Sequence, residues 1–186
     1  MFGKLFGKNK EEDKKRKFSG DLSLNDLQKG DFLDYFMRSW EVKDVTLFDW
    51  GNNDFSKELT LNNGKEEKYL SIDSEIDVDL VLSEKISILD LDTNIAGHFR
   101  ERNDPPETLI YKNTTYTLSE ESQGHFISEE DHNNGLDNWT PFVNFDYRGR
   151  LGREFISIVQ LGQQEFLAYA GNEVKSLEFS NFIPRN

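Results

Sequence analysis

The feature that most constrains this fold is a two-residue alternation of apolar and polar side chains along several short segments. Residues 58–61, 77–83 and 143–147 follow this period, with aliphatic or aromatic side chains alternating with polar ones such as Glu58, Asp79 and Asp146. Successive side chains of a strand point to opposite faces, so these segments predict half-buried antiparallel strands with their acids toward solvent. Residues 155–161 are largely apolar on both faces, which predicts a central strand.

Residues that favour turns separate these segments. They occur at Asn62-Asn63-Gly64, Asn133-Asn134-Gly135, Arg148-Gly149-Arg150, Gly162 and Gly171-Asn172. Their spacing predicts about ten strands joined by short hairpins, and hence a mostly β protein. The one predicted exception is a short helical turn near the N-terminus, where Ser23 precedes Leu24 and Leu27 and Gly30-Asp31 ends the turn.

Two parts of the chain have similar patterns. Tyr35 and Trp40 have the same spacing as Tyr111 and Tyr116, and residues 69–72 resemble residues 155–158. This similarity predicts two small, duplicated β units of barrel or sandwich type, although alternating sequences also match one another by chance.

The duplication defines a domain prediction. A mobile basic leader covers residues 1–20, a first β unit residues 21–93, and a second β unit residues 107–186. Between the units, residues 94–106 lose the strand period and include Asp104-Pro105-Pro106, so we expect a linker there.

Charge is distributed unevenly along the 186 residues. Residues 1–17 hold seven basic and three acidic side chains, a net charge of +4, so the total of −13 leaves −17 on the remainder. Phosphate backbones repel such a body, and we therefore expect no nucleic-acid partner.

The absence of cysteine excludes disulfides and cysteine-ligated metal sites. No apolar run approaches the roughly 20 residues that cross a bilayer, and the first residues lack the continuous apolar segment of a secretory signal. These features predict a cytoplasmic protein. Any membrane contact would be peripheral and at the inner membrane.

No catalytic or metal motif is present. Residues 90–101 have the oxygen-ligand spacing of a calcium loop, but the sixth position is Ile95 where such loops need glycine. His98, His125 and His132 have no metal-ligand spacing. We therefore predict no catalytic residue, no metal site and no cofactor, although folding could still bring a pair of carboxylates together.

The leader supports a prediction of weak membrane contact. Phe2, Leu5 and Phe6 would share one helical face, while Lys4 and Lys8 would meet anionic lipid headgroups. Against this, the segment is short and contains glycine, and the acidic body opposes approach. A solvated leader is the alternative prediction.

The chain also resembles a known family. The similarity covers residues 22 to 183 and depends on strand and turn patterns: Leu27-x-x-Gly30-Asp31, Tyr35, Trp40-Glu41-Val42, Glu58-x-x-Leu61, Tyr69-Leu70-x-Ile72, Ile110-Tyr111, Tyr116-Thr117-Leu118 and residues 166–174. These resemble the bacterial domain of unknown function 4178. The resemblance implies an accessory role near the cell envelope or in membrane stress, and it assigns no site residue. Relatives often carry a cysteine-bearing zinc-ribbon segment, which this chain lacks.

Taken together, the sequence predicts a non-catalytic accessory or interaction protein with an unidentified protein partner. A second hypothesis is a small-molecule-binding β-barrel whose pocket is lined by Trp40, Trp50 or Tyr69. A third hypothesis, which we favour less, is a carboxylate-dependent hydrolase, and convergent acids of raised pKa would be its sign.

Overall fold

The computed structural model describes residues 22–73, 80–91, 95–102, 104–162 and 165–185. In these residues the chain forms eleven strands, two α-helices and three short 3-10 turns. The strands are β1 (Phe32–Tyr35), β2 (Arg38–Gly51), β3 (Asp54–Asn62), β4 (Glu67–Asp73), β5 (Leu80–Ile86), β6 (Thr108–Tyr111), β7 (Thr114–Ser128), β8 (Thr140–Gly149), β9 (Glu154–Leu161), β10 (Glu165–Val174) and β11 (Phe179–Ile183). The helices are α1 (Ile95–Arg102) and α2 (Glu129–Asn133), and the 3-10 turns are η1 (Leu24–Asp26), η2 (Ile88–Asp90) and η3 (Ser176–Glu178).

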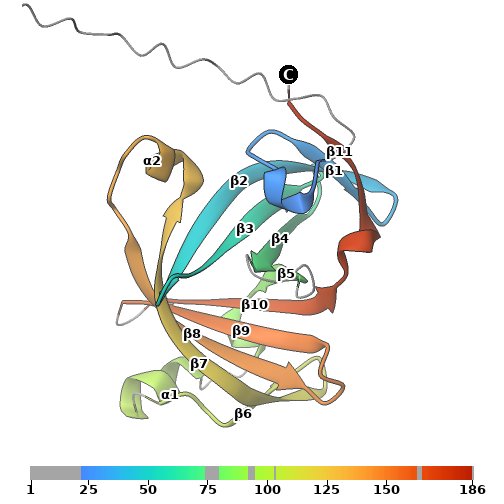
Figure 1. Cartoon of the computed structure of the whole chain (residues 1–186). Helices are drawn as coiled ribbons and strands as arrows, with labels where there is room; N and C mark the ends of the chain where they lie inside the picture. Colours follow the sequence, from blue (N-terminus) through green and yellow to red (C-terminus); the bar gives the residue numbers. More distant parts are fainter. Residues whose placement is uncertain (1–21, 74–79, 92–94, 103, 163–164, 186) are drawn as a thin grey trace, which may run out of the picture.

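The mostly β, antiparallel prediction is confirmed, and all eleven described strands belong to one sheet in the order β11-β1-β2-β3-β4-β5-β10-β9-β8-β7-β6. An additional pairing between β2 and β7 joins residues 46–49 to residues 125–128. In that order β2 and β7 are the two ends of a series of eight strands, β2-β3-β4-β5-β10-β9-β8-β7. Their direct pairing closes this series into a ring over part of its height. Figure 1 shows these strands meeting at the left of the view.

The strands repeat in two matching runs. β1 to β5 and β6 to β10 each begin with a four-residue strand, a tight turn and a strand of 14 or 15 residues. Both tight turns have positive φ angles at their two central residues, Phe36-Met37 and Lys112-Asn113, as a type I′ hairpin requires. The residues that suggested duplication hold equivalent places, because Trp40 pairs with Leu33 and Tyr116 with Leu109.

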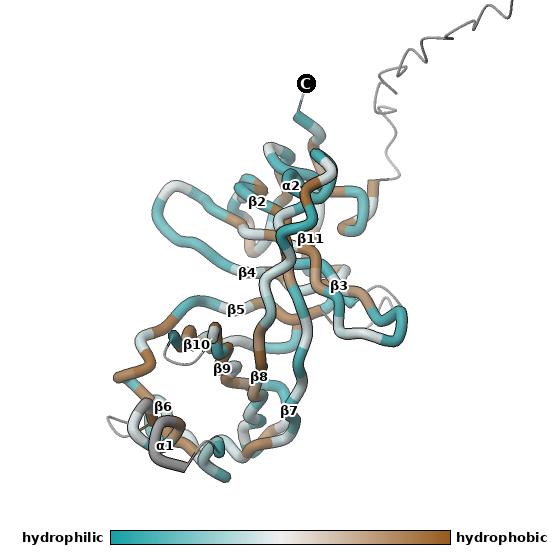
Figure 2. Tube along the Cα trace, turned by 90° about the vertical axis from the view of Figure 1, so that its left-hand side faces the viewer, coloured by the Kyte–Doolittle hydropathy of each residue, from teal (hydrophilic) through white to brown (hydrophobic). Residues whose placement is uncertain are grey.

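Each run has its own hydrophobic core, on the face of the strands that points away from the ring interior. The first core contains Leu59, Leu61, Leu70 and Ile72 and is extended by Leu24 and Leu27 from η1 and its flank. The second core is made of residues from β6 to β10 together with α1 and Leu91, which follows η2. In Figure 2 the strands β5, β10, β9, β8, β7 and β6 follow one another around the lower part of the molecule, with α1 beside β6.

Some local details differ from the sequence expectations. The predicted turn at the N-terminus is present as η1, with Ser23 at its N-cap. The segment expected as a linker contains α1, whose Ile95 and Phe99 lie one helical turn apart and enter the second core. Gly171 lies inside β10 instead of in a turn. No helix of the described residues is long and apolar enough to span a membrane.

Tyr147 lies in the second core and is fully buried, and its hydroxyl finds no hydrogen-bond partner among the described residues. A buried hydroxyl without a partner costs free energy that phenylalanine avoids. We therefore expect Tyr147→Phe to raise the free energy of unfolding by about 0.5–1 kcal/mol in urea denaturation. A loss of stability would contradict this and would reveal a hydrogen bond to the hydroxyl.

Candidate functional site

The interior of the ring is a chamber of about 380 Å³, within the size range of small-molecule sites. One face of each ring strand packs into a core, and the opposite face forms the wall of the chamber. Because side chains alternate along a strand, one residue enters a core and the next lines the chamber. On β4, for example, Leu70 and Ile72 belong to the first core, while Tyr69 and Ser71 line the chamber. The chamber is therefore a direct product of the two-residue period.

Polar side chains form matching pairs on the two sides of the chamber. On the first side Glu58 of β3 lies opposite Ser71 of β4, and on the second side Asp146 of β8 lies opposite Ser157 of β9. Ser71 and Ser157 occupy the same place in the repeated segments 69–72 and 155–158. The two runs of strands therefore place one carboxyl and one hydroxyl on each side of the same cavity.

Glu58 is enclosed by protein, although part of its side chain faces the cavity. This burial raises the pKa of its carboxyl to about 7, against a small opposing effect of the hydrogen bond that Ser71 donates over 3.1 Å. Asp146 is in a similar position, because burial raises the pKa of its carboxyl while Ser157 and Asn144 oppose the change. Ser157 Oγ also donates a hydrogen bond of 2.6 Å to Asn144 Oδ1.

The placement of these acids corrects one sequence expectation. Glu58 and Asp146 stand at polar positions of alternating strands, and we expected such positions to face solvent. In the structure they face the chamber, because the ring turns that face of the strands inward. The period of a strand gives two faces but does not say which of them is enclosed. A signal was nevertheless present, since both acids lie opposite the serines of a repeated segment.

Aromatic rings cover the wall where β2 meets β7. Phe48 stacks on Trp50 with ring centroids 5.8 Å apart, and Phe142 meets both rings edge to face. Phe126 of β7 completes this group, 6.1 Å from Phe48. Trp50 donates a hydrogen bond of 2.8 Å from Nε1 to Ser56 Oγ, so its polar edge is satisfied while its ring remains against the cavity.

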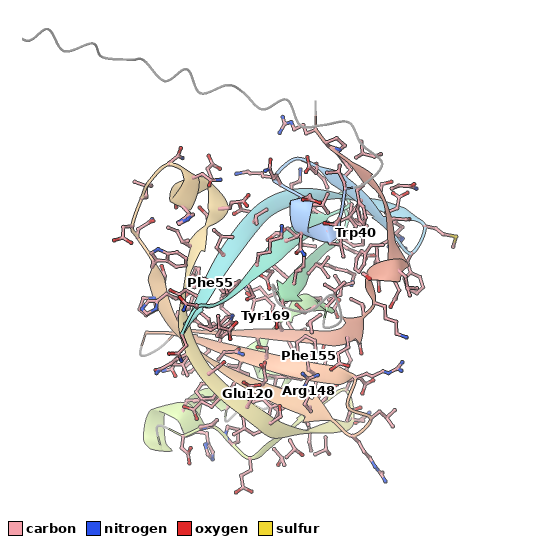
Figure 3. All side chains as sticks on the ribbon, in the orientation of Figure 1. Trp40, Phe55, Glu120, Arg148, Phe155 and Tyr169 are labelled. Carbon is pink, nitrogen blue, oxygen red and sulfur yellow. The ribbon has the colours of Figure 1, made fainter. Side chains whose placement is uncertain are left out.

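A second aromatic group lies on β4, β9 and β10. Tyr69 and Tyr169 meet edge to face with ring centroids 5.2 Å apart. Burial, followed by the charges of Glu58 and Glu67, raises the pKa of Tyr169 to about 12, so this ring stays neutral near pH 7. The ring of Phe155 lies over Gly171, where an added Cβ would be 2.6 Å from it. Figure 3 shows Tyr169 and Phe155 between the upper and lower strands.

Arg148 is the one basic residue of the chamber lining. Its side chain is 43% exposed, and Nη1 lies 2.5 Å from Glu173 Oε1. The guanidinium is thus exposed to solvent and paired with Glu173. Its charge lowers the pKa of Asp146 less than the hydrogen bonds from Ser157 and Asn144 do. The enclosed part of the chamber is left with acids and neutral groups.

Of the aromatic residues predicted for a pocket, the structure brings Trp50 and Tyr69 to the chamber. Trp40 lies in the first core with 2% of its surface exposed, and Figure 3 places it near β1 and β11. The leader residues Phe2, Lys4, Leu5, Phe6 and Lys8 lie outside the described residues. In the part of the chain that is described, His, Asp and Glu side chains do not gather in threes that could hold a metal ion.

The Gly30-Asp31 motif has a structural role. Gly30 has a φ of 92° and donates a backbone hydrogen bond of 2.7 Å to Val42. Asp31 is buried and accepts hydrogen bonds from the backbone N–H groups of Gln28 and Arg185, at 2.8 Å and 2.9 Å. It therefore fastens the C-terminal segment to the start of β1, far from the chamber lining.

Comparison with known proteins identifies a family for this chain but assigns it no activity. The chain is 28% identical over 182 residues to an "Uncharacterized protein" of Aquifex aeolicus (strain VF5), which covers 98% of this chain and 96% of the relative. No solved structure matches the chain. The family model described as "Domain of unknown function (DUF4178)" matches residues 28–176, which include all eight strands of the ring and all of the chamber lining. The chain therefore belongs to the DUF4178 family.

Proposed function

We propose that this protein is a small-molecule-binding module and that its ligand occupies the chamber inside the strand ring. The observation that carries the proposal is the partly open cavity of about 380 Å³, which is lined by aromatic rings together with hydroxyl, amide and carboxyl groups. This combination is typical of small-molecule sites, where apolar walls supply contact area and a few polar groups fix the orientation of the ligand.

Hydrolysis by a pair of carboxyls stays a prediction. A carboxylate-dependent hydrolase needs one carboxyl that stays ionised and one that stays protonated. Burial raises the pKa of both Glu58 and Asp146, and the direction of these shifts does not assign the two roles.

The proposal can be tested by retention of small molecules. We expect the immobilised full chain to retain at least one compound from a small-molecule extract of bacterial cytosol, identified by mass spectrometry. Ser157→Phe places a ring inside the chamber and should abolish this retention, and Ser157→Leu should weaken it. Ser180→Phe on the exposed face of β11 is the matched control. Equal retention by all four proteins, or by none, would contradict the proposal.

An accessory role with a protein partner is a second candidate function, favoured by the turn between β1 and β2. Phe36 is 72% exposed and Met37 is 100% exposed in this turn, whereas the equivalent turn of the second run carries Lys112 and Asn113. Exposed apolar pairs at a protruding turn are common where proteins meet. An envelope role and membrane contact through the leader stay predictions.

A further inference from the structure

The charge inside the chamber is unbalanced. Glu58 and Asp146 line it from opposite sides, and Arg148, the basic residue of the lining, is exposed and paired with Glu173. Tyr69 and Tyr169 add no charge near neutral pH, because burial raises the pKa of both phenols. Arg148 is the one cation of the lining that acts on Asp146, and none of the described lining residues supplies a cation that acts on Glu58.

A buried carboxylate without a cation is unfavourable, and two events relieve it. Either the carboxyl takes up a proton, or a positively charged group enters the cavity beside it. The second event is favoured by the rest of the wall. Phe48, Trp50 and Tyr169 line the cavity, and the faces of aromatic rings carry the negative side of a quadrupole that attracts cations. Carboxylates and aromatic faces attract the same kind of ligand.

We propose that the chamber recognises an organic ammonium ion, held between its aromatic walls with its charge toward Glu58 and Asp146. This inference rests on the proposed small-molecule function and names the chemical class of the ligand. An anion would meet two carboxyls without a free cation, and an uncharged ligand would leave the ionised acids unbalanced. An ammonium ion with alkyl or aromatic substituents satisfies both the charge and the apolar surface.

The test compares choline with its uncharged isostere 3,3-dimethylbutan-1-ol, using ligand-observed NMR titration of the full chain at pH 8. The two probes have the same shape and differ in charge. We expect choline to bind at least about tenfold more tightly, because its quaternary ammonium, which has no N–H to donate, is attracted by aromatic faces and by carboxylates, whereas the uncharged alcohol is not. Glu58→Gln should lower choline affinity about tenfold, and Glu120→Gln on the exposed part of β7 should leave it unchanged.

The outcomes separate the two proposals. If the uncharged alcohol binds as tightly as choline and Ser157→Phe abolishes its binding, the chamber is a ligand site but the cation inference is wrong. If neither probe binds, the cation inference is also wrong, and the retention experiment decides the proposed function independently. Choline binding that survives both Glu58→Gln and Ser157→Phe would overturn the inference, because the site would lie elsewhere.

A pH series adds a readout that a merely structural role of Glu58 would not give. Choline keeps its charge at every pH, so a change in affinity reports the protein. The groups that face Glu58 are Thr46 on β2, Ser71 and Tyr69 on β4, and Tyr169 on β10, and none of them titrates between pH 6 and 8. Burial also raises the pKa of Asp146 across the chamber, so the same series in Glu58→Gln serves as the reference. With a Glu58 pKa of about 7 and a neutral form that binds about tenfold more weakly, we expect about fivefold weaker binding of the wild type at pH 6 than at pH 8, and a smaller change in Glu58→Gln. A flat profile would contradict the role of Glu58.

Discussion

Glu58→Gln is expected to stabilise the ligand-free protein at pH 8, even though it removes a charge from the proposed site. The carboxyl has an ordinary pKa of 4.5 and reaches about 7 in the folded chain. Keeping it ionised in the fold at pH 8 then costs about 3 kcal/mol. Because part of the side chain faces the cavity, where water screens the charge, we expect about 1–2 kcal/mol to be recovered. Glutamine keeps the acceptor for the Ser71 hydroxyl.

The pH dependence gives this prediction its sign. Between pH 4.5 and 7 the folded state holds a proton on Glu58 that the unfolded state has lost. Stability from this group is therefore fully present below pH 4.5, falls as the pH rises toward 7 and is lost above it. In Glu58→Gln this decline should disappear, so the melting temperatures of variant and wild type should diverge by about 3–6 °C on going from pH 5 to pH 8.

The matched control is Glu120→Gln, which removes the same charge from an exposed position of β7. Surface charges of this kind change stability little, so its melting curve should follow that of the wild type at each pH. If both variants gain the same stability at pH 8, the gain comes from the reduced net charge of an acidic protein. Burial of Glu58 would then be refuted as the cause.

Gly124→Ala is expected to destabilise the protein by about 2–3 kcal/mol, because it crowds the pairing that closes the ring. A Cβ at this position of β7 would lie 2.6 Å from the backbone carbonyl oxygen of Asp49 on β2. It would also lie 3.3 Å from the ring of Phe142. A backbone oxygen in a sheet cannot turn aside as a flexible side chain does, so the two strands must separate locally.

Urea denaturation of Gly124→Ala and Gly97→Ala would test this prediction. Gly97 lies in α1, where an added Cβ meets nothing within 4 Å, and alanine favours a helix over glycine by up to about 1 kcal/mol. The control should therefore be neutral or more stable. Equal stability of Gly124→Ala and the wild type would show that β2 and β7 are not held closely together at this point.

Much of the fold could be predicted from the sequence, because strand period and turn residues are local properties. The repeated residues around Tyr35 and Tyr111 revealed two equivalent hairpins, since each stands just before a tight turn with positive φ angles. Helix α1 is hard to predict because it is short and, among its described side chains, Ile95 and Phe99 are the ones that enter a core. Gly171 suggested a turn, although its role is to make room for the ring of Phe155.

The candidate site was harder to predict, because it depends on pairings between strands that are distant in the sequence. Trp50 and Tyr69 could be named as pocket residues, since a barrel interior collects aromatic side chains. Trp40 follows the same pattern but lies on the core face. The strand period predicts that Glu58 and Asp146 face solvent, because the sequences of β3 and β8 alone do not show that the sheet closes into a ring.

The order of strand pairing also bears on how this chain reaches its native state. Eight of the described pairings join strands that follow one another along the chain, whereas β2–β7, β5–β10 and β1–β11 join distant ones. Closing a long loop costs entropy before its contacts form, so neighbouring hairpins assemble first. We therefore expect most of each core to form within its own run, with Val174 and Phe179 joining the first core later, and the cavity to form only when β2 pairs with β7 and β5 with β10.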